Sequence, residues 1–341
     1  MRKAKDPKKP AKITVGGQAV LDGVMMQAPD RIAIAVRRGD GKVALRSRPI
    51  RKLSDKYPFL GWPVIRGVAN FAQMLVSGVK TLSESADMAG FQAEEPSALE
   101  KKAAKLLRRK PEDVMMAFAV ILAVILAVGL FFMLPTGIES LVKRKIENRY
   151  ALNAIGAAIR LTLFLAYVYF VSKLKDIKRV FRYHGAEHKS VFCFEAGLPL
   201  TVENARGFSS LHPRCGTSFL VIVMVISFFV FALLGTNSAN VFLRVGSRLL
   251  LLPLVAGISY EALKWLGRAR ENRLVRALKW PGLMAQKLTT AEPDDSMIEV
   301  ALIALKAALG LPDPLPRALD PDAPPDGPEA AEADPVGEAR D

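Results

Sequence analysis

The feature that most constrains the fold is a run of 21 residues without a charged side chain, Val114 to Leu134. A helix needs about 20 apolar residues to cross the hydrocarbon core of a bilayer, so this run predicts a membrane span. We expect it to end at Pro135-Thr136-Gly137. Three further apolar segments, roughly 151–171, 217–234 and 241–265, are also candidates. The sequence therefore predicts an α-helical multi-pass membrane protein with about four transmembrane helices.

Charge is the second guide to the class of protein. The 341 residues carry a net charge of +15, although 51% of them are hydrophobic and the mean hydropathy is +0.21. In a soluble protein this excess would favour nucleic-acid binding. Here basic residues flank the apolar runs, where they set topology and contact anionic headgroups. We therefore expect the lipid bilayer as a partner and no specific nucleic acid.

The distribution of basic residues predicts the topology. They gather before the first span, in the segment 172–216 and after the fourth span. The positive-inside rule then places both termini and this segment in the cytosol, and we expect the protein in the inner (cytoplasmic) membrane of the cell. A basic group after the first span, Lys143, Arg144, Lys145 and Arg149, would lie on the opposite side.

Outside the spans, the sequence predicts a small cytosolic α+β part. Residues 32–38 and 43–48 alternate apolar and polar side chains around a Gly39-Asp40-Gly41-Lys42 turn, which predicts a β-hairpin. Pro281-Gly282 predicts a break, and Asp294-Asp295-Ser296 precedes an amphipathic helix at 297–309. The segments follow in this order: a basic tail (1–12), a β-rich segment (13–60), an amphipathic helix with a basic linker (61–112), two spans (113–172), a cytosolic loop (173–216), two spans (217–265), a helical segment (266–310) and a Pro-rich acidic tail expected to be disordered (311–341).

Charged residues interrupt two of the apolar runs, and three of them could pair with one another. Arg160 lies within the second span, and Arg248 and Glu261 lie within the fourth. An arginine near the bilayer centre costs about 3 kcal/mol, so these side chains are expected to pair inside a helical bundle. They are also the only sequence support for a transporter, a function that four spans without an inverted repeat make the least favoured.

A compact set of His, Glu and Cys residues predicts chemistry at the cytosolic face. His184, Glu187 and His188 form an H-x-x-E-H pattern, in which the two histidines share one face of a helix and can share a metal ion. This is the inverted zincin pattern, in which Glu187 is the general base. His212 and Cys215 follow, three residues apart. Together with His184 and His188 they would form a tetrahedral set of four ligands for zinc or another divalent transition metal.

Several alternatives stay open for this set. Four protein ligands would make a structural site, whereas a catalytic site keeps one position open and leaves His212 or Cys215 as a bystander. The histidines could instead be interfacial residues bonded to the backbone, and Cys215 a small buried thiol. Further oxygen donors are Asp22, which an ordinary turn also explains, and Glu195, Glu203 and Glu261. Glu261 best matches the distant downstream glutamate of inverted zincins.

Five stretches together resemble the YqhQ-type family of bacterial multi-pass membrane proteins. They are Gly16–Met26, Tyr183–Lys189, Leu200–Asn204, His212–Phe219 and Pro281-Gly282 with Leu288–Asp295. The resemblance covers roughly residues 13–310, and it implies a predicted metal-dependent enzyme. This sequence has Asp22 where the family has glutamate, which keeps the acid but shortens its reach. Family members are often encoded near translation genes, which implies a role in membrane-protein synthesis.

Two functions therefore lead. The first is a membrane-bound zinc hydrolase that acts on a lipid or a membrane peptide at the cytosolic interface, with Glu187 as its base. The second is a non-enzymatic membrane factor with a structural metal, which would assist membrane-protein biogenesis or the translocon. Its partners would be other membrane proteins or the translocation machinery.

Overall fold

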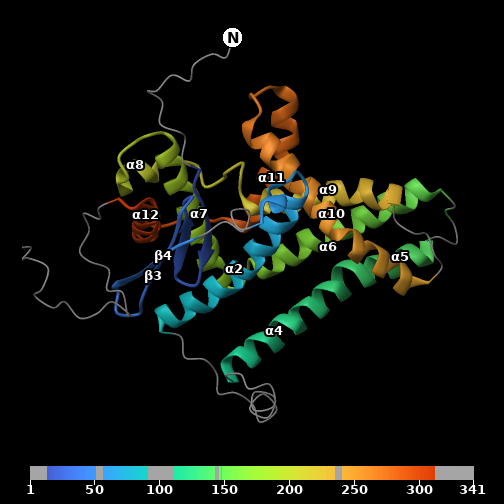
Figure 1. The fold of residues 1–341 in the computed structure, drawn as a ribbon, viewed down its shortest axis with the longest axis horizontal. Helices are drawn as coiled ribbons and strands as arrows, with labels where there is room; N and C mark the ends of the chain where they lie inside the picture. Colours follow the sequence, from blue (N-terminus) through green and yellow to red (C-terminus); the bar gives the residue numbers. More distant parts are fainter. Residues whose placement is uncertain are drawn as a thin grey trace, which may run out of the picture.

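The computed structural model describes residues 14–50, 57–90, 111–142, 146, 148–234 and 240–311. The basic tail, most of the basic linker, the acidic tail beyond residue 311 and the basic group at 143–145 lie outside these residues. Figure 1 shows a part built around a β-sheet on the left and a set of long helices on the right. The helix α2 (Ile65–Ala89), preceded by a short 3-10 helix η1 (Pro58–Gly61), lies between them.

Within the described residues, the sheet is an antiparallel meander of four strands in the order β1-β2-β3-β4. The strands are β1 (Gly16–Val20), β2 (Gly23–Gln27), β3 (Arg31–Arg37) and β4 (Val43–Pro49). The predicted hairpin is confirmed as β3 and β4, whose register runs from Arg31 opposite Pro49 to Arg37 opposite Val43. The glycine-rich stretch before it forms the hairpin β1–β2, with Asp22 in its turn at a φ of 52°.

Helices cover both faces of the sheet. On one face Val24, Met26 and Ala33 share a core with Tyr183 of α7 (Lys175–Glu195) and with α12 (Asp295–Leu309). The short helix α8 (Val202–Arg206) also packs against α7 and α12. On the other face the strand residues form a second cluster with Met88 near the end of α2. The sheet thus packs between α7 and α2 and fixes the position of α7 relative to the long helices.

The helix α12 begins as the sequence predicts, because the Asp294 carboxylate accepts a hydrogen bond from the backbone N–H of Met297. Its predicted amphipathic character is wrong. Val300, Leu302 and Leu305 are buried, and so is nearly every other side chain of the helix between residues 297 and 308. A helix that is apolar on all sides has to be buried, and α12 lies between the sheet, α7 and α8.

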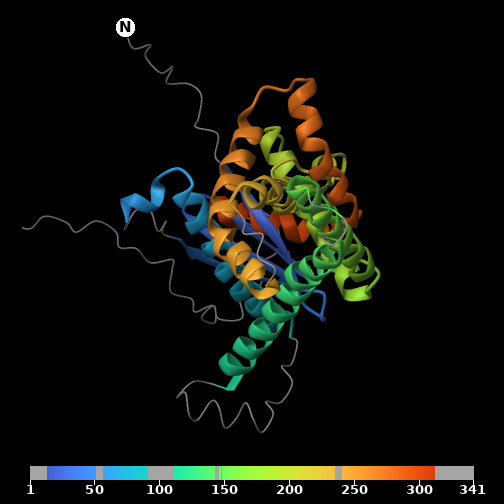
Figure 2. The same cartoon turned by 90° about the vertical axis from the view of Figure 1, so that its right-hand side faces the viewer.

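Four helices within the described residues are long and apolar enough to cross a membrane, at Val114–Val142, Ala151–Val171, Gly216–Leu233 and Val241–Arg268. They correspond to α4 (Pro111–Val128) with its continuation, α6 (Arg149–Val171), α9 (Gly216–Leu234) and α10 (Val241–Arg268). Figure 2 shows α4 projecting beyond the sheet and the other helices. The number of candidate spans matches the prediction.

The first of these helices does not end at Pro135. A π-helical turn, η2 (Gly129–Met133), joins α4 to α5 (Leu134–Val142). In this turn the Leu134 N–H donates to the carbonyl of Gly129, five residues back. Such a turn changes the hydrogen-bond register of a helix, and this is how the helix passes the proline and continues for two further turns. The residue Glu139 therefore lies within the candidate span.

Two helices connect the sheet part to the long helices. At the crossing of α2 with α10 the backbones of Gly67 and Gly257 approach closely, and the Arg66 Nε donates to Glu261 at 2.6 Å. The helix α11 (Arg273–Thr289) runs through Pro281 without the predicted break and packs on α9. Gly282 makes this packing possible, because a Cβ there would lie 2.8 Å from the Ser218 hydroxyl.

Candidate metal centre

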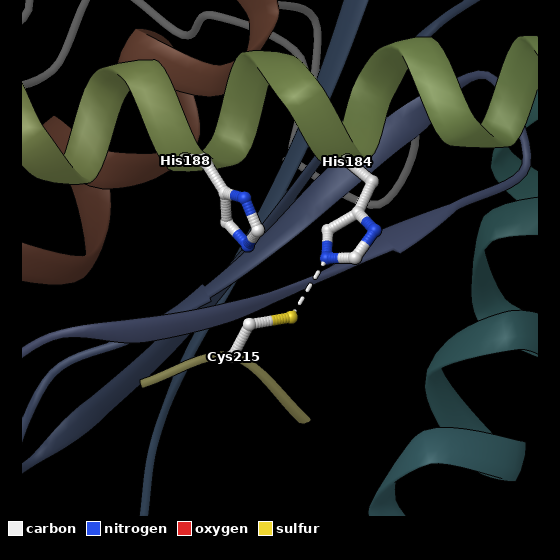
Figure 3. Close-up of side chains that lie close together, drawn as sticks. All are labelled: His184, His188 and Cys215. Atoms are coloured by element: carbon white, nitrogen blue, oxygen red, sulfur yellow. Dashed lines mark hydrogen bonds between the residues drawn. The ribbon is translucent and has the colours of Figure 1, made fainter. Parts of the chain in front are cut away.

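Three potential metal ligands meet where α7 passes the start of α9. His184 and His188 lie on one face of α7, and Cys215 is the residue immediately before α9 (Figure 3). One ligand atom from each of the three lies within 4.8 Å of the other two, and the His184 Nε2 is 3.1 Å from the Cys215 Sγ. These three residues form the candidate site for a metal ion, and they are called the metal centre below.

Hydrogen bonds fix which nitrogen of each ring faces the metal centre. The Nδ1 of His184 is 2.8 Å from the carbonyl of Thr289, and the Nδ1 of His188 is 2.6 Å from the carbonyl of Ser210. A carbonyl only accepts, so each Nδ1 carries the proton and each Nε2 has a free lone pair. The His188 Nε2 is buried, with no hydrogen-bond partner among the described residues. Metal-binding histidines are oriented in this way.

The spacing of the three atoms fits one zinc ion. Zinc binds nitrogen at about 2.0–2.1 Å and sulfur at about 2.3 Å, which places tetrahedral ligands roughly 3–4 Å apart. The observed atoms need only small side-chain rotations to reach that spacing. Two imidazoles and a thiolate also form a ligand set typical of zinc. The residues present therefore fit the metal, and they leave a fourth position for another ligand.

Glu187 lies beside the metal centre and is almost completely buried. Burial raises the pKa of its carboxyl, while nearby His184 and His212 and a hydrogen bond from the Gly17 backbone N–H lower it. The absence of a side chain at position 17 makes this contact possible, because a Cβ there would lie 2.8 Å from the Glu187 Cγ. The first strand of the sheet thus positions the carboxylate.

A cavity of about 250 Å³ lies next to these residues. Glu187, His188 and Cys215 contribute to its wall. The rest of the wall is mainly apolar and comes from β1, α2, α9 and α10, including Phe71, Phe219 and Leu263. The metal centre is therefore reached through an apolar space between the sheet part and the long helices.

His212, the fourth predicted ligand, lies near the metal centre but outside the group of three. Its ring centroid is 5.6 Å from that of His188. The backbone N–H of Arg214 donates to its Nδ1 at 3.3 Å, so the neutral ring carries its proton on Nε2. That Nε2 is 3.5 Å from the Glu195 carboxylate without forming a hydrogen bond. Burial lowers the pKa of His212 to about 4, so the ring is neutral at pH 7.

Three of the other predicted candidates pair with basic side chains and lie outside the metal centre. Asp22 pairs with Arg179, Glu195 with Arg214 and Glu261 with Arg66. Glu203 is exposed on α8. Arg160 and Arg248 pair with Glu139 of α5, and not with Glu261 as their positions within the apolar runs had suggested.

Sequence reasoning missed one residue that shapes the metal centre. Gln286 of α11 is fully buried. Its side-chain oxygen accepts from the His212 N–H at 2.8 Å, and its nitrogen donates to the His212 carbonyl at 2.7 Å and to the Ser218 hydroxyl at 2.8 Å. Gln286 therefore holds the segment that carries Cys215. No local pattern marks it, because its partners are about 70 residues away.

Comparisons with known proteins identify the family of the chain. Residues 62–311 match the family model described as "Protein of unknown function (DUF1385)". The chain is 36% identical over 303 residues to "Uncharacterized protein YqhQ" of Bacillus subtilis (strain 168), an alignment that covers 87% of this chain and 92% of the relative. No solved structure matches. The family match and the extent of the alignment show that the chain belongs to the DUF1385 family, of the YqhQ type.

Proposed function

We propose that the protein is an integral membrane hydrolase that uses a zinc ion, or another divalent transition metal, held by His184, His188 and Cys215. The convergence of the two unprotonated Nε2 atoms and the thiol beside a buried carboxylate carries this proposal. Three protein ligands with an open fourth position are typical of catalytic zinc, whereas structural zinc sites are closed by four.

Glu187 is the general base of the proposed reaction. Its carboxylate lines the cavity, and burial moves its pKa upward, toward the range in which a carboxylate accepts a proton at neutral pH. The bound metal would supply a Lewis acid that polarises the bond to be cleaved. The Gly17 N–H and the packing of β1 on α7 hold the carboxylate in place while it takes a proton from the attacking water.

The substrate is a lipid or a membrane peptide. The apolar wall of the cavity favours an apolar group, and α2 and α10 provide part of that wall where the long helices meet the sheet part. We place the sheet part and both termini in the cytosol, because the basic residues gather on this side of the candidate spans. The reaction would then take place at the cytosolic surface of the inner membrane.

Elemental analysis of the detergent-purified protein is the first test. About one zinc or other transition metal per chain is expected in the wild type, and none in a variant with both His184→Ala and His188→Ala. Glu187→Gln should keep the metal and fail to restore function to a strain that lacks the gene. Glu203→Gln, an exposed change on α8, is the matched control and should restore it. Full complementation by Glu187→Gln would refute the mechanism.

A second candidate is a non-enzymatic factor with a structural metal, which supports membrane-protein biogenesis or the translocon. The observation in its favour is that the three ligands join α7 to the segment before α9, as a structural metal would. This function predicts that loss of the metal unfolds the segment around Cys215, whereas Glu187→Gln has a mild effect. It also predicts that crosslinking captures a membrane-protein partner.

A further inference from the structure

A second charged cluster lies inside the long helices, apart from the metal centre. Glu139 of α5 accepts hydrogen bonds from Arg160 of α6 at 2.9 Å and from Arg248 of α10 at 2.7 Å. Arg244, one turn earlier on α10, lies 3.9 Å from the same carboxylate. Its guanidinium also donates to the backbone carbonyl of Thr136 at 3.2 Å. These four side chains, Glu139, Arg160, Arg244 and Arg248, are called the arginine cluster below.

The arginine cluster is not neutral. Among the described residues, three positive charges face one negative charge, which leaves a net charge of +2. Glu139, Arg244 and Arg248 are each at most 5% exposed, so water reaches little of this charge. A buried charge without a partner is strongly unfavourable, and in a membrane such residues normally find a counter-ion. The arginine cluster therefore lacks negative charge.

The cluster also has more hydrogen-bond donors than acceptors. The Nε atoms of Arg160 and Arg244 are buried and have no partner in the part of the chain that the structure describes. The Nδ2 of Asn153, seven residues before Arg160 and so on the same face of α6, is likewise buried and unpaired. All three unpaired groups donate. A ligand that satisfied them would have to be negative and rich in acceptors.

The helices are shaped to bring these groups together. A Cβ at Gly156 would lie 1.6 Å from the Glu139 Oε1, so α6 can pass the carboxylate only because this residue is glycine. The Arg248 guanidinium also lies 5.8 Å from the centroid of the Phe231 ring. This ring contact and the hydrogen bond to Glu139 orient the Arg248 guanidinium before any ligand arrives. A preorganised guanidinium group binds phosphate oxygens through paired hydrogen bonds.

We propose that the arginine cluster binds a phosphate group, either the phosphodiester headgroup of an anionic lipid or free phosphate. Arg244 lies in the first turn of α10. If α10 spans the bilayer, this turn lies at the level of the lipid phosphates. The metal centre lies near the opposite end of α10, beside Tyr260 and Leu263. The phosphate site would thus lie in the leaflet on the opposite side of the membrane from the metal centre.

The test measures thermal unfolding of the full-length, detergent-purified protein with four probes: phosphatidylglycerol, diacylglycerol without phosphate, inorganic phosphate, and chloride at equal ionic strength. Saturable stabilisation by phosphatidylglycerol alone identifies a lipid headgroup as the ligand, and stabilisation by inorganic phosphate as well identifies a site open to free phosphate. If neither phosphate probe stabilises the wild type beyond its control, the proposal is wrong.

Two variants locate the effect. Arg244→Gln should weaken the apparent affinity for the effective probe about tenfold, the loss expected for one charge-assisted hydrogen bond. Arg268→Gln, an exposed arginine at the other end of α10, should leave it unchanged. Equal affinity in the wild type and in Arg244→Gln would overturn the assignment.

Glu139→Gln provides an independent measurement if Arg244→Gln does not fold. Removing the carboxylate raises the net charge of the arginine cluster, so a phosphate probe should bind more tightly and restore more of the lost thermal stability. In a purely structural ion-pair network, this variant would lose stability and the probe would not recover it. That second result would contradict the phosphate site without bearing on the metal centre.

Discussion

Replacing Gln286 with leucine should destabilise the protein by roughly 2–6 kcal/mol, because it leaves two buried backbone groups of His212 without partners. Each unsatisfied buried donor or acceptor costs about 1–3 kcal/mol. The Ser218 hydroxyl can rotate toward another acceptor, so its lost bond is not counted. Because this segment carries Cys215, the metal should also bind more weakly.

Thermal unfolding of the detergent-purified protein, with and without added zinc, is the assay. At roughly 2–4 °C for each kcal/mol, the unfolding temperature should fall by roughly 4–24 °C. Lys287→Leu makes the same change at the exposed neighbouring position and should have little effect. An unchanged unfolding temperature in Gln286→Leu would refute the assigned role.

Three further outcomes are expected, each checked by thermal unfolding. A chelator should lower the unfolding temperature of the wild type but not that of the variant without both histidines of the metal centre, because a ligand stabilises only the state that binds it. Gly156→Ala should lower the free energy of unfolding by about 1–3 kcal/mol, because its Cβ would overlap the Glu139 carboxylate. Gly137→Ala is its control, because a Cβ there meets nothing within 4 Å in the described part of the chain. Gly67→Ala should destabilise the protein by a similar amount, because its Cβ would lie 2.8 Å from the α10 backbone. Gly61→Ala is its control, because a Cβ at position 61 also meets no described atom within 4 Å.

The parts of the fold that depend on local patterns could be predicted from the sequence. The hairpin β3–β4 follows from alternation around a turn, and the start of α12 follows from the Asp294 cap. The pairing of His184 with His188 on one helical face follows from their spacing of four residues. These features need only neighbours in the chain, so a single sequence contains enough information to predict them.

The remaining features depend on contacts between distant segments. The hydropathy pattern cannot tell that a π-helical turn lets the first candidate span pass Pro135, so Glu139 had been left out of the helical bundle. The spacing of His212 and Cys215 likewise says nothing about which ring atom faces the metal centre. That depends on the N–H of Arg214, which occupies the His212 Nδ1. Ring orientation is set by such contacts and not by residue type.

In the proposed function, metal binding and substrate access depend on different helices. The candidate ligands come from α7 and the segment before α9, whereas α2 and α10 contribute only to the wall of the cavity. The contact between α2 and α10 depends on the pair Arg66–Glu261 and on the close approach of Gly67 to Gly257. None of these four residues belongs to the metal centre. A change at this crossing would therefore alter which apolar group reaches the metal centre while the affinity for the metal stays the same. The two properties can vary independently because different helices carry them.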